Sequence, residues 1–163
     1  MKKFIIALML VAPMTMFAQK FGHINAQEVM QSMPEFSIAQ GEIQAKAKEF
    51  DNELQEMSQE LQKQYEEYMK VRETLPQTKQ EEKEKELNEL SQKFQQAQQD
   101  YQQQMQQLQQ EKQQPLYTKL MNAITAVGKA GNYVYIMDVS GALFINDAVS
   151  EDVTTKVKAE LKK

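Results

Sequence analysis

The chain has 163 residues, a formal net charge of −4 and no cysteine. The absence of cysteine excludes disulfides, thiolate catalysis, cysteine-based metal sites and the cysteine-linked lipid anchor of exported proteins. An acidic chain without a basic patch is also a poor match for nucleic acid.

The first 18 residues predict a secretory signal peptide. Lys2 and Lys3 form a short basic region, and residues 4–12 form an apolar run that is too short to span a bilayer. The small residue Ala18 offers a cleavage point, so we expect cleavage after Ala18 and export of the remaining chain. A buried N-terminal helix is the alternative interpretation. No second apolar segment of the sequence is long enough to cross a membrane, so we expect no stable membrane insertion.

Residues 35–74 predict one long helix with a single apolar seam. Apolar residues recur there at spacings of three and four, which is the heptad pattern of a coiled coil. Glu, Gln and Lys on the other faces favour helix and stay solvated. The seam consists of Ile43, Ala47, Phe50, Leu54, Met57, Leu61, Gln64, Tyr68, Val71 and Leu75.

A second long helix is predicted to begin near residue 79. Its seam runs through Leu87, Leu90, Phe94, Ala97 and Tyr101, then shifts phase near Gln104 and continues through Met105 and Leu108. Fourteen of the residues between 92 and 114 are glutamine. A low-complexity glutamine tract also permits disorder, but the persistent apolar spacing favours a helix with an uncharged outer face.

The residues between the two helices predict the tip of an αα-hairpin. Pro76 disfavours helical geometry at Leu75 and ends the first helix. Thr78 stands three residues before Glu81, a capping box that starts the second helix. The tip therefore comprises Leu75, Pro76, Gln77 and Thr78. A single kinked helix is the alternative interpretation, but it would leave both seams without a partner.

The two ends of the chain predict a small β-containing body. We expect strands at 21–25 and 132–139, a third strand at 142–146 that pairs back after a turn at Ser140–Gly141, and a last helix that begins at Ser150–Asp152. A short helix follows the first strand, and Gly128 and Gly131 end the second long helix. The body spans 19–34 and 116–163, and residues 35–115 form the arm.

A body of this size is marginally stable alone. It nevertheless carries large apolar and aromatic side chains, and the economical solution is a core shared between several copies, whose number the residues do not fix. The candidates for this core are Phe21, Tyr133, Tyr135, Ile136 and Phe144.

Segments near the two ends of the chain resemble the Skp/OmpH family of periplasmic chaperones. The segments that carry the resemblance are "NAQEVMQSMPEF", "GNYVYIMDVSGALFIND" and "EDVTTKV". The resemblance implies an α+β, mostly α fold: a homotrimer in which three long antiparallel coiled-coil hairpins project, jellyfish-like, from a shared trimerisation body. It also implies an ATP-independent periplasmic holdase that encloses unfolded outer-membrane proteins. Because this chain is acidic and glutamine-rich, no basic lipopolysaccharide site is carried over.

The sequence contains no set of residues for catalysis or cofactor binding. His23, the one histidine, is interpreted as a structural strand residue, and no glycine-rich phosphate loop is present. We therefore expect no enzyme activity, cofactor or metal.

The candidate client contacts are Tyr65, Tyr68, Met69 and Met105, with ordinary seam packing as the alternative for each. Pro115 is a candidate hinge near the root of the arm, and a structural coiled-coil spacer of the envelope is the alternative function.

Overall fold

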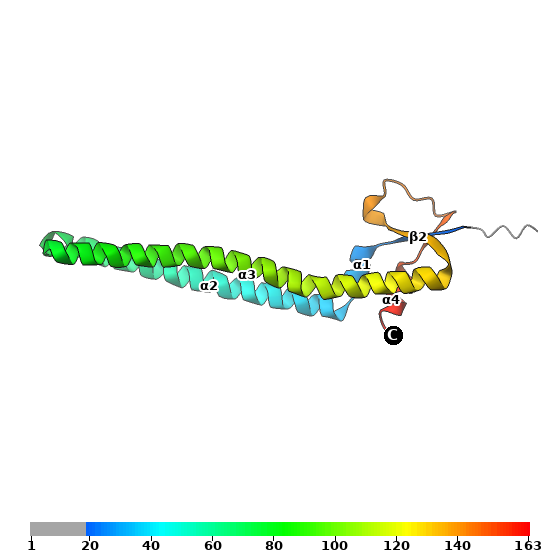
Figure 1. Ribbon diagram of the computed structural model, residues 1–163, viewed down its shortest axis with the longest axis horizontal. Helices are drawn as coiled ribbons and strands as arrows, with labels where there is room; N and C mark the ends of the chain where they lie inside the picture. The colour runs from blue at the N-terminus through cyan, green and yellow to red at the C-terminus, as the bar shows by residue number, and fades with distance from the viewer. Residues whose placement is uncertain (1–18) are drawn as a thin grey trace, which may run out of the picture. The chain divides into compact units, whose positions relative to one another are not determined.

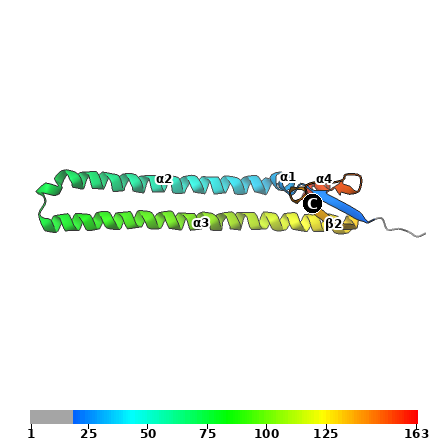
Figure 2. The same cartoon turned by 90° about the horizontal axis from the view of Figure 1, so that it is seen from above.

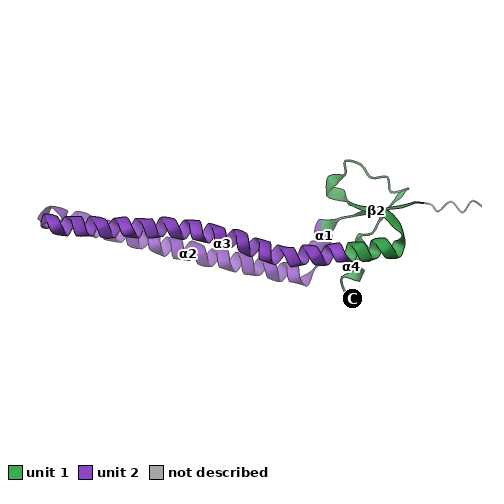
Figure 3. Cartoon of the chain, in the orientation of Figure 1, with its two compact units in different colours: residues 1–26, 123–163 green, residues 27–122 purple. Residues whose placement is uncertain are grey.

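The structure is a computed structural model that describes residues 19–163. The predicted signal peptide and its cleavage after Ala18 lie outside the described residues. Two compact units share the chain. One unit comprises residues 27–122, and the other combines the described residues up to 26 with residues 123–163 (Figure 3).

The helical unit is an antiparallel hairpin of two long helices. Helix α2 (Pro34–Val71) and helix α3 (Gln77–Gly131) run side by side, as both views show (Figures 1 and 2). A short helix α1 (Ala26–Gln31) precedes them. Side chains of α2 and α3 pair in strict antiparallel order: Tyr101 with Glu53, Lys112 with Glu42 and Lys119 with Glu35. The hairpin prediction is confirmed, and the alternative of one kinked helix is wrong.

The seam between α2 and α3 is a narrow stripe on each helix. On α2 it buries Ala39, Ile43, Phe50 and Tyr68, and on α3 of this unit it buries Leu116 and Leu120. At its centre Phe50 stacks on Tyr101 with ring centroids 4.0 Å apart and planes within 7°. The Tyr101 hydroxyl donates to Glu53, so the aromatic contact is fixed by a hydrogen bond at its polar end.

The tip differs in detail from the predicted capping box. Helix α2 ends at Val71, and a 3-10 turn η1 (Arg72–Thr74) leads to Leu75, whose extended backbone is the geometry expected before a proline. Helix α3 already begins at Gln77, so Thr78 lies inside it and does not cap it. The Pro76 carbonyl accepts from the first free amides, and the Gln80 side chain donates to the Arg72 and Leu75 carbonyls at 2.9 Å. Gln80 therefore replaces the threonine as the group that closes the turn.

The second unit contains a three-stranded parallel sheet. Strand β1 (Lys20–Ile24) lies in the centre, between β2 (Tyr133–Asp138) and β3 (Ser150–Asp152), and both neighbours pair with it in parallel. Helix α3 ends at Gly131, and Asn132 takes a positive φ of 52° that turns the chain into β2. A Cβ on Gly131 would lie 2.2 Å from the Tyr133 ring, so this position requires glycine.

Three predictions for this unit are wrong. Gly128 does not end α3, because the helix continues through it to Gly131. Residues 142–146 form no strand, because a 3-10 turn η2 (Val139–Gly141) carries the chain away from the sheet. Residues 150–152 form strand β3 instead of a helix start, and helix α4 (Thr154–Glu160) begins only after them. The Asp152 carboxylate accepts from the Thr154 amide at 2.8 Å and so satisfies the first amide of α4 from the end of the strand.

The seam generates a prediction about arm stability. Phe50→Ala removes the buried, stacked ring, and we expect the free energy of unfolding to fall by about 3 kcal/mol, because the seam has no other layer to close the gap. Tyr65→Ala on the same helix removes an exposed ring and serves as the matched control. Urea denaturation followed by circular dichroism measures both variants, and equal midpoints for the two would contradict the packing described here.

Candidate functional surfaces

An exposed apolar pair lies on the outer face of α2. Tyr65 and Met69 stand one helical turn apart, with 54% and 46% of their surfaces exposed. Their immediate neighbours on α2 are Glu66, Glu67 and Lys70, so the two side chains form a small apolar surface among charged residues. A flexible methionine beside an aromatic ring suits apolar contacts of varied shape.

Tyr68 lies in the seam, as the heptad pattern predicts, and not with the outer pair as a candidate client contact. Its ring is only 6% exposed and lies in the seam, and its hydroxyl donates to Glu84 of α3 at 2.7 Å. Burial of the phenol, followed by its hydrogen bond to the Glu84 carboxylate, raises the pKa of Tyr68. Tyr68 therefore holds the two helices together near the tip.

A hollow of about 850 Å³ opens beside Tyr68, between α2 and α3. Val71, Leu75 and Leu87 form its apolar part, and lysines and glutamates alternate around it. Arg72 lies 3.7 Å from Glu84 across the same end of the arm. The hollow can take an apolar side chain while the mixed charges around it remain solvated.

The other two arm candidates lie along α3. Met105 is half-buried and belongs to the seam pattern, which favours packing over an outward contact. Pro115 lies inside α3, and the helix continues through it. It lines a small hollow with Glu35, Ile38 and Ala39, so it stands at the level of the start of α2, as the sequence predicts. Its role as a hinge stays a prediction.

The second unit exposes a larger apolar surface. On edge strand β2 these residues are Val134, Tyr135 and Met137, and in the loop that follows they are Leu143, Phe144 and Val149. Phe144 is 82% exposed. So many large apolar side chains exposed on one small unit are unusual on an isolated protein, and large exposed apolar surfaces are typical of interaction sites. Of the other predicted core residues, Phe21 is half-buried and stacks on Tyr135 with centroids 4.9 Å apart, and Ile136 is half-buried.

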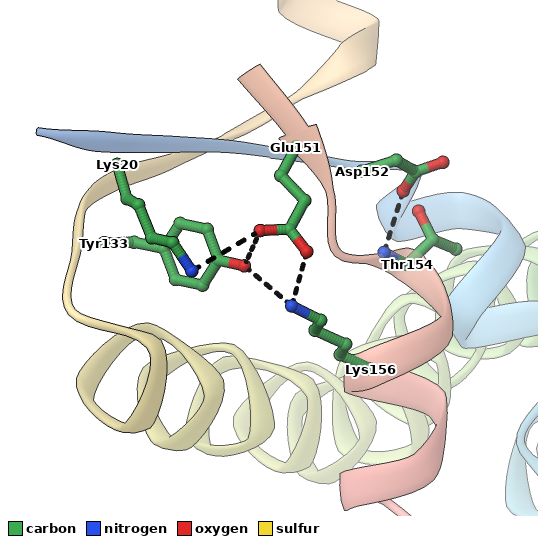
Figure 4. A network of polar contacts seen from close by, with 6 residues as sticks. All are labelled: Lys20, Tyr133, Glu151, Asp152, Thr154 and Lys156. Atoms are coloured by element: carbon green, nitrogen blue, oxygen red, sulfur yellow. Dashed lines mark hydrogen bonds and ion pairs between the residues drawn. The ribbon is translucent and has the colours of Figure 1, made fainter. Parts of the chain in front are cut away.

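Tyr133 is held inside its own unit by a polar network (Figure 4). Its hydroxyl donates to Glu151 at 2.5 Å and accepts from Lys156 at 3.0 Å, and Lys156 also donates to Glu151 at 2.5 Å. The Lys20 ammonium lies 5.3 Å from the centre of the Tyr133 ring. The network joins β1, β2, β3 and α4. The bonds from Lys156 and Tyr133 lower the pKa of Glu151, and the Glu151 carboxylate raises the pKa of Lys156.

His23 joins two strands. Its side chain is buried on β1, with Nδ1 2.9 Å from the Ser150 hydroxyl on β3 and Nε2 3.9 Å from the exposed Asp147 carboxylate. Among residues 19–163 no group of three or more His, Asp or Glu side chains is placed to hold a metal ion. No helix in the same range is long and apolar enough to cross a membrane.

Comparisons with known proteins agree on one family. The family model described as outer membrane protein (OmpH-like) matches residues 20–161. A crystal structure from Caulobacter crescentus CB15, described as a candidate outer membrane chaperone (OmpH-like), has a TM-score of 0.76 and 17% sequence identity, and the match covers 88% of this chain and 83% of that one. This likeness shows that the two chains share the fold. No curated protein matches this chain.

The network around Tyr133 generates a prediction about acid stability. Because the folded-state pKa of Glu151 lies below its ordinary value of 4.5, its contribution is complete above that pH and is lost as the pH falls through the folded-state pKa. Glu151→Gln should therefore lower the stability at pH 7 and show a smaller further loss between pH 5 and about pH 3. Urea midpoints of parent and variant across this range measure the difference, and parallel curves would contradict it.

Proposed function

The chain belongs to the OmpH-like family, and from that premise we propose that it is an ATP-independent holdase of the periplasm. In this proposal it encloses unfolded outer-membrane proteins and keeps their apolar segments from aggregating. It needs no nucleotide and no cofactor, because binding alone shields the client.

The exposed Tyr65–Met69 pair is the observation that carries this proposal. A stable two-helix arm needs no apolar side chains on its outer face, and exposed apolar side chains lower the solubility of a protein. Contact with a client would explain why this pair is present. The surrounding surface is a mixture of Glu, Lys and uncharged glutamine. Apolar contact is therefore the main attraction on offer, and it depends little on salt.

We also propose that the functional form is a homotrimer. The exposed residues on β2 and in the loop after it supply an apolar surface that other copies of the chain would cover. Edge strand β2 pairs with β1 on one side, so its other side offers main-chain groups to a partner. Three arms projecting from one shared body would surround a space for the client.

A structural spacer of the cell envelope remains the second candidate. The unbroken antiparallel pairing from Glu35–Lys119 to Tyr68–Glu84 favours a stiff arm, which suits a spacer. A spacer would have no use for the Tyr65–Met69 pair, and the experiment below separates the two candidates.

Client holding should depend on the exposed pair. The double variant Tyr65→Ser, Met69→Ser should need roughly tenfold more protein to suppress aggregation of an outer-membrane β-barrel protein diluted from urea, since each lost contact is worth about 1–2 kcal/mol when buried. Light scattering during dilution measures this, without nucleotide and at low and moderate salt. Lys63→Ser, on the same exposed helix, is the control and should match the parent. A parent that leaves aggregation unchanged would favour the spacer, and a steep loss with salt would contradict apolar capture.

Trimer formation should depend on the loop aromatic. Phe144→Asp should raise the concentration at which the trimer dissociates by about tenfold or more, because it places a charge in the proposed interface. Phe144 packs little within its own chain, so a change reports contact between copies. Multi-angle light scattering measures the mass, with Tyr65→Ser as the control. A parent that stays monomeric at micromolar concentration would overturn the trimer.

A further inference from the structure

A second hollow lies on the outer face of α3 and has an unusual lining. It measures about 630 Å³ and is formed by five glutamines together with Tyr117 of α3 and Met30 of α1. We call it the glutamine groove. The glutamines are Gln106, Gln109, Gln110, Gln113 and Gln114. Among the described residues none that lines the groove carries a charge.

The helix repeat explains how these residues come together. Positions 106, 110 and 114 form one row along α3, and positions 109, 113 and 117 form the next, each with a spacing of four residues. The seam residues Leu108 and Leu116 lie on a different face, toward α2. The groove is therefore the outer side of a helix whose inner side is already packed.

The amides in the groove are available, in contrast to the few glutamines of the arm that pair with a carboxylate on their own helix. Gln62, Gln96 and Gln107 each donate to a carboxylate four residues later, at 2.8 to 3.0 Å. The five groove glutamines have glutamine, tyrosine or threonine at the corresponding positions. Within residues 19–163 their side chains make no hydrogen bond. Five donors and five acceptors thus face outward in one place.

This chemistry selects the kind of partner. A glutamine amide both donates and accepts, which complements the alternating N–H and C=O groups of an extended polypeptide. A folded protein has already paired those groups, and a phosphate or an ammonium group would need opposite charge. Tyr117 and Met30 add apolar contact area to the lining for one side chain of the bound segment. From Gln106 to Gln114 the helix rises about 12 Å, which matches three to four extended residues.

We propose that the glutamine groove binds extended segments of unfolded polypeptide through their backbone, as a second client site beside the Tyr65–Met69 pair. The inference rests on the proposed holdase function and names the part of the client that is recognised, its backbone. Recognition through the backbone ignores the client's side-chain charge. The groove would then allow an acidic chain to hold acidic and basic clients alike.

The test uses the full mature chain and two matched blocks of substitutions. The groove block changes Gln106, Gln109, Gln110 and Gln113 to Ala, and the control block changes Gln98, Gln99, Gln102 and Gln103 to Ala. The control glutamines also lack a carboxylate four residues later, but they do not line the hollow with Met30 and Tyr117, so the comparison isolates the groove. Both blocks raise helix propensity equally, so neither should unfold α3. Suppression of aggregation of the urea-diluted β-barrel protein should weaken about tenfold in the groove block and stay near the parent in the control block.

A second measurement tests the backbone directly. An uncharged peptide of about eight residues, rich in Val, Thr and Tyr, should compete with the client, and the same peptide with alternate backbone nitrogens methylated should compete at least several-fold less well. Equal competition by both peptides, or equal behaviour of the two blocks in a parent that holds client, would overturn the groove while leaving the holdase intact. A groove block that changes the oligomer mass without changing client holding would instead identify a second copy as the occupant, and would also overturn it.

Discussion

Two helices can bury only one stripe of each other, and the rest of this molecule follows from that geometric constraint. The stripe has the Phe50–Tyr101 stack near its middle and includes the buried Leu116 and Leu120. There is no third layer in the helical unit, so most of each helix faces water along its whole length. The sequence meets this exposure with Glu, Lys and glutamine, and wherever an apolar or unpaired side chain appears outside the stripe, packing does not explain it. Ile38, Tyr65, Met69 and the glutamine groove stand out for this reason.

The sheet is subject to a related limit. Its three parallel strands come from distant parts of the chain, and the connection from β1 to β2 is the whole helical hairpin. The hairpin is therefore an insertion into a parallel crossover, which ties the fold of the small unit to both ends of the chain. The network of Lys20, Tyr133, Glu151 and Lys156 reinforces this unit with polar contacts where a large core is missing. The apolar residues left exposed on β2 and in the loop after it are the surface that oligomerisation would use.

Sequence reasoning was strongest where one periodic signal decides the structure. The spacing of Ile43, Phe50 and Tyr68 predicted the seam, and the proline at 76 predicted the turn.

Sequence reasoning failed where competing local signals have similar weight. Ser150–Asp152 has the composition of a helix start, yet pairing with β1 makes it a strand, and a parallel partner so far away in sequence leaves no local trace. Tyr68 was assigned both to the seam and to the candidate client contacts, and its burial decides for the seam. The glutamine groove was missed because its glutamines look like the rest of the tract, where Gln98 and Gln102 also lack a carboxylate four residues later. Only the fold brings Met30 of α1 to these glutamines.

The central claim is a division of labour, in which the outer faces of the arm contact the client and the exposed surface of the sheet unit contacts other copies of the chain. Site-specific photo-crosslinking tests it most directly, with a photoreactive residue at position 65 or at position 144 and a urea-diluted outer-membrane β-barrel protein as client. We expect position 65 to cross-link to the client and position 144 to cross-link to a second copy of this chain, with or without client. Client cross-links at position 144 together with none at position 65 would contradict the claim.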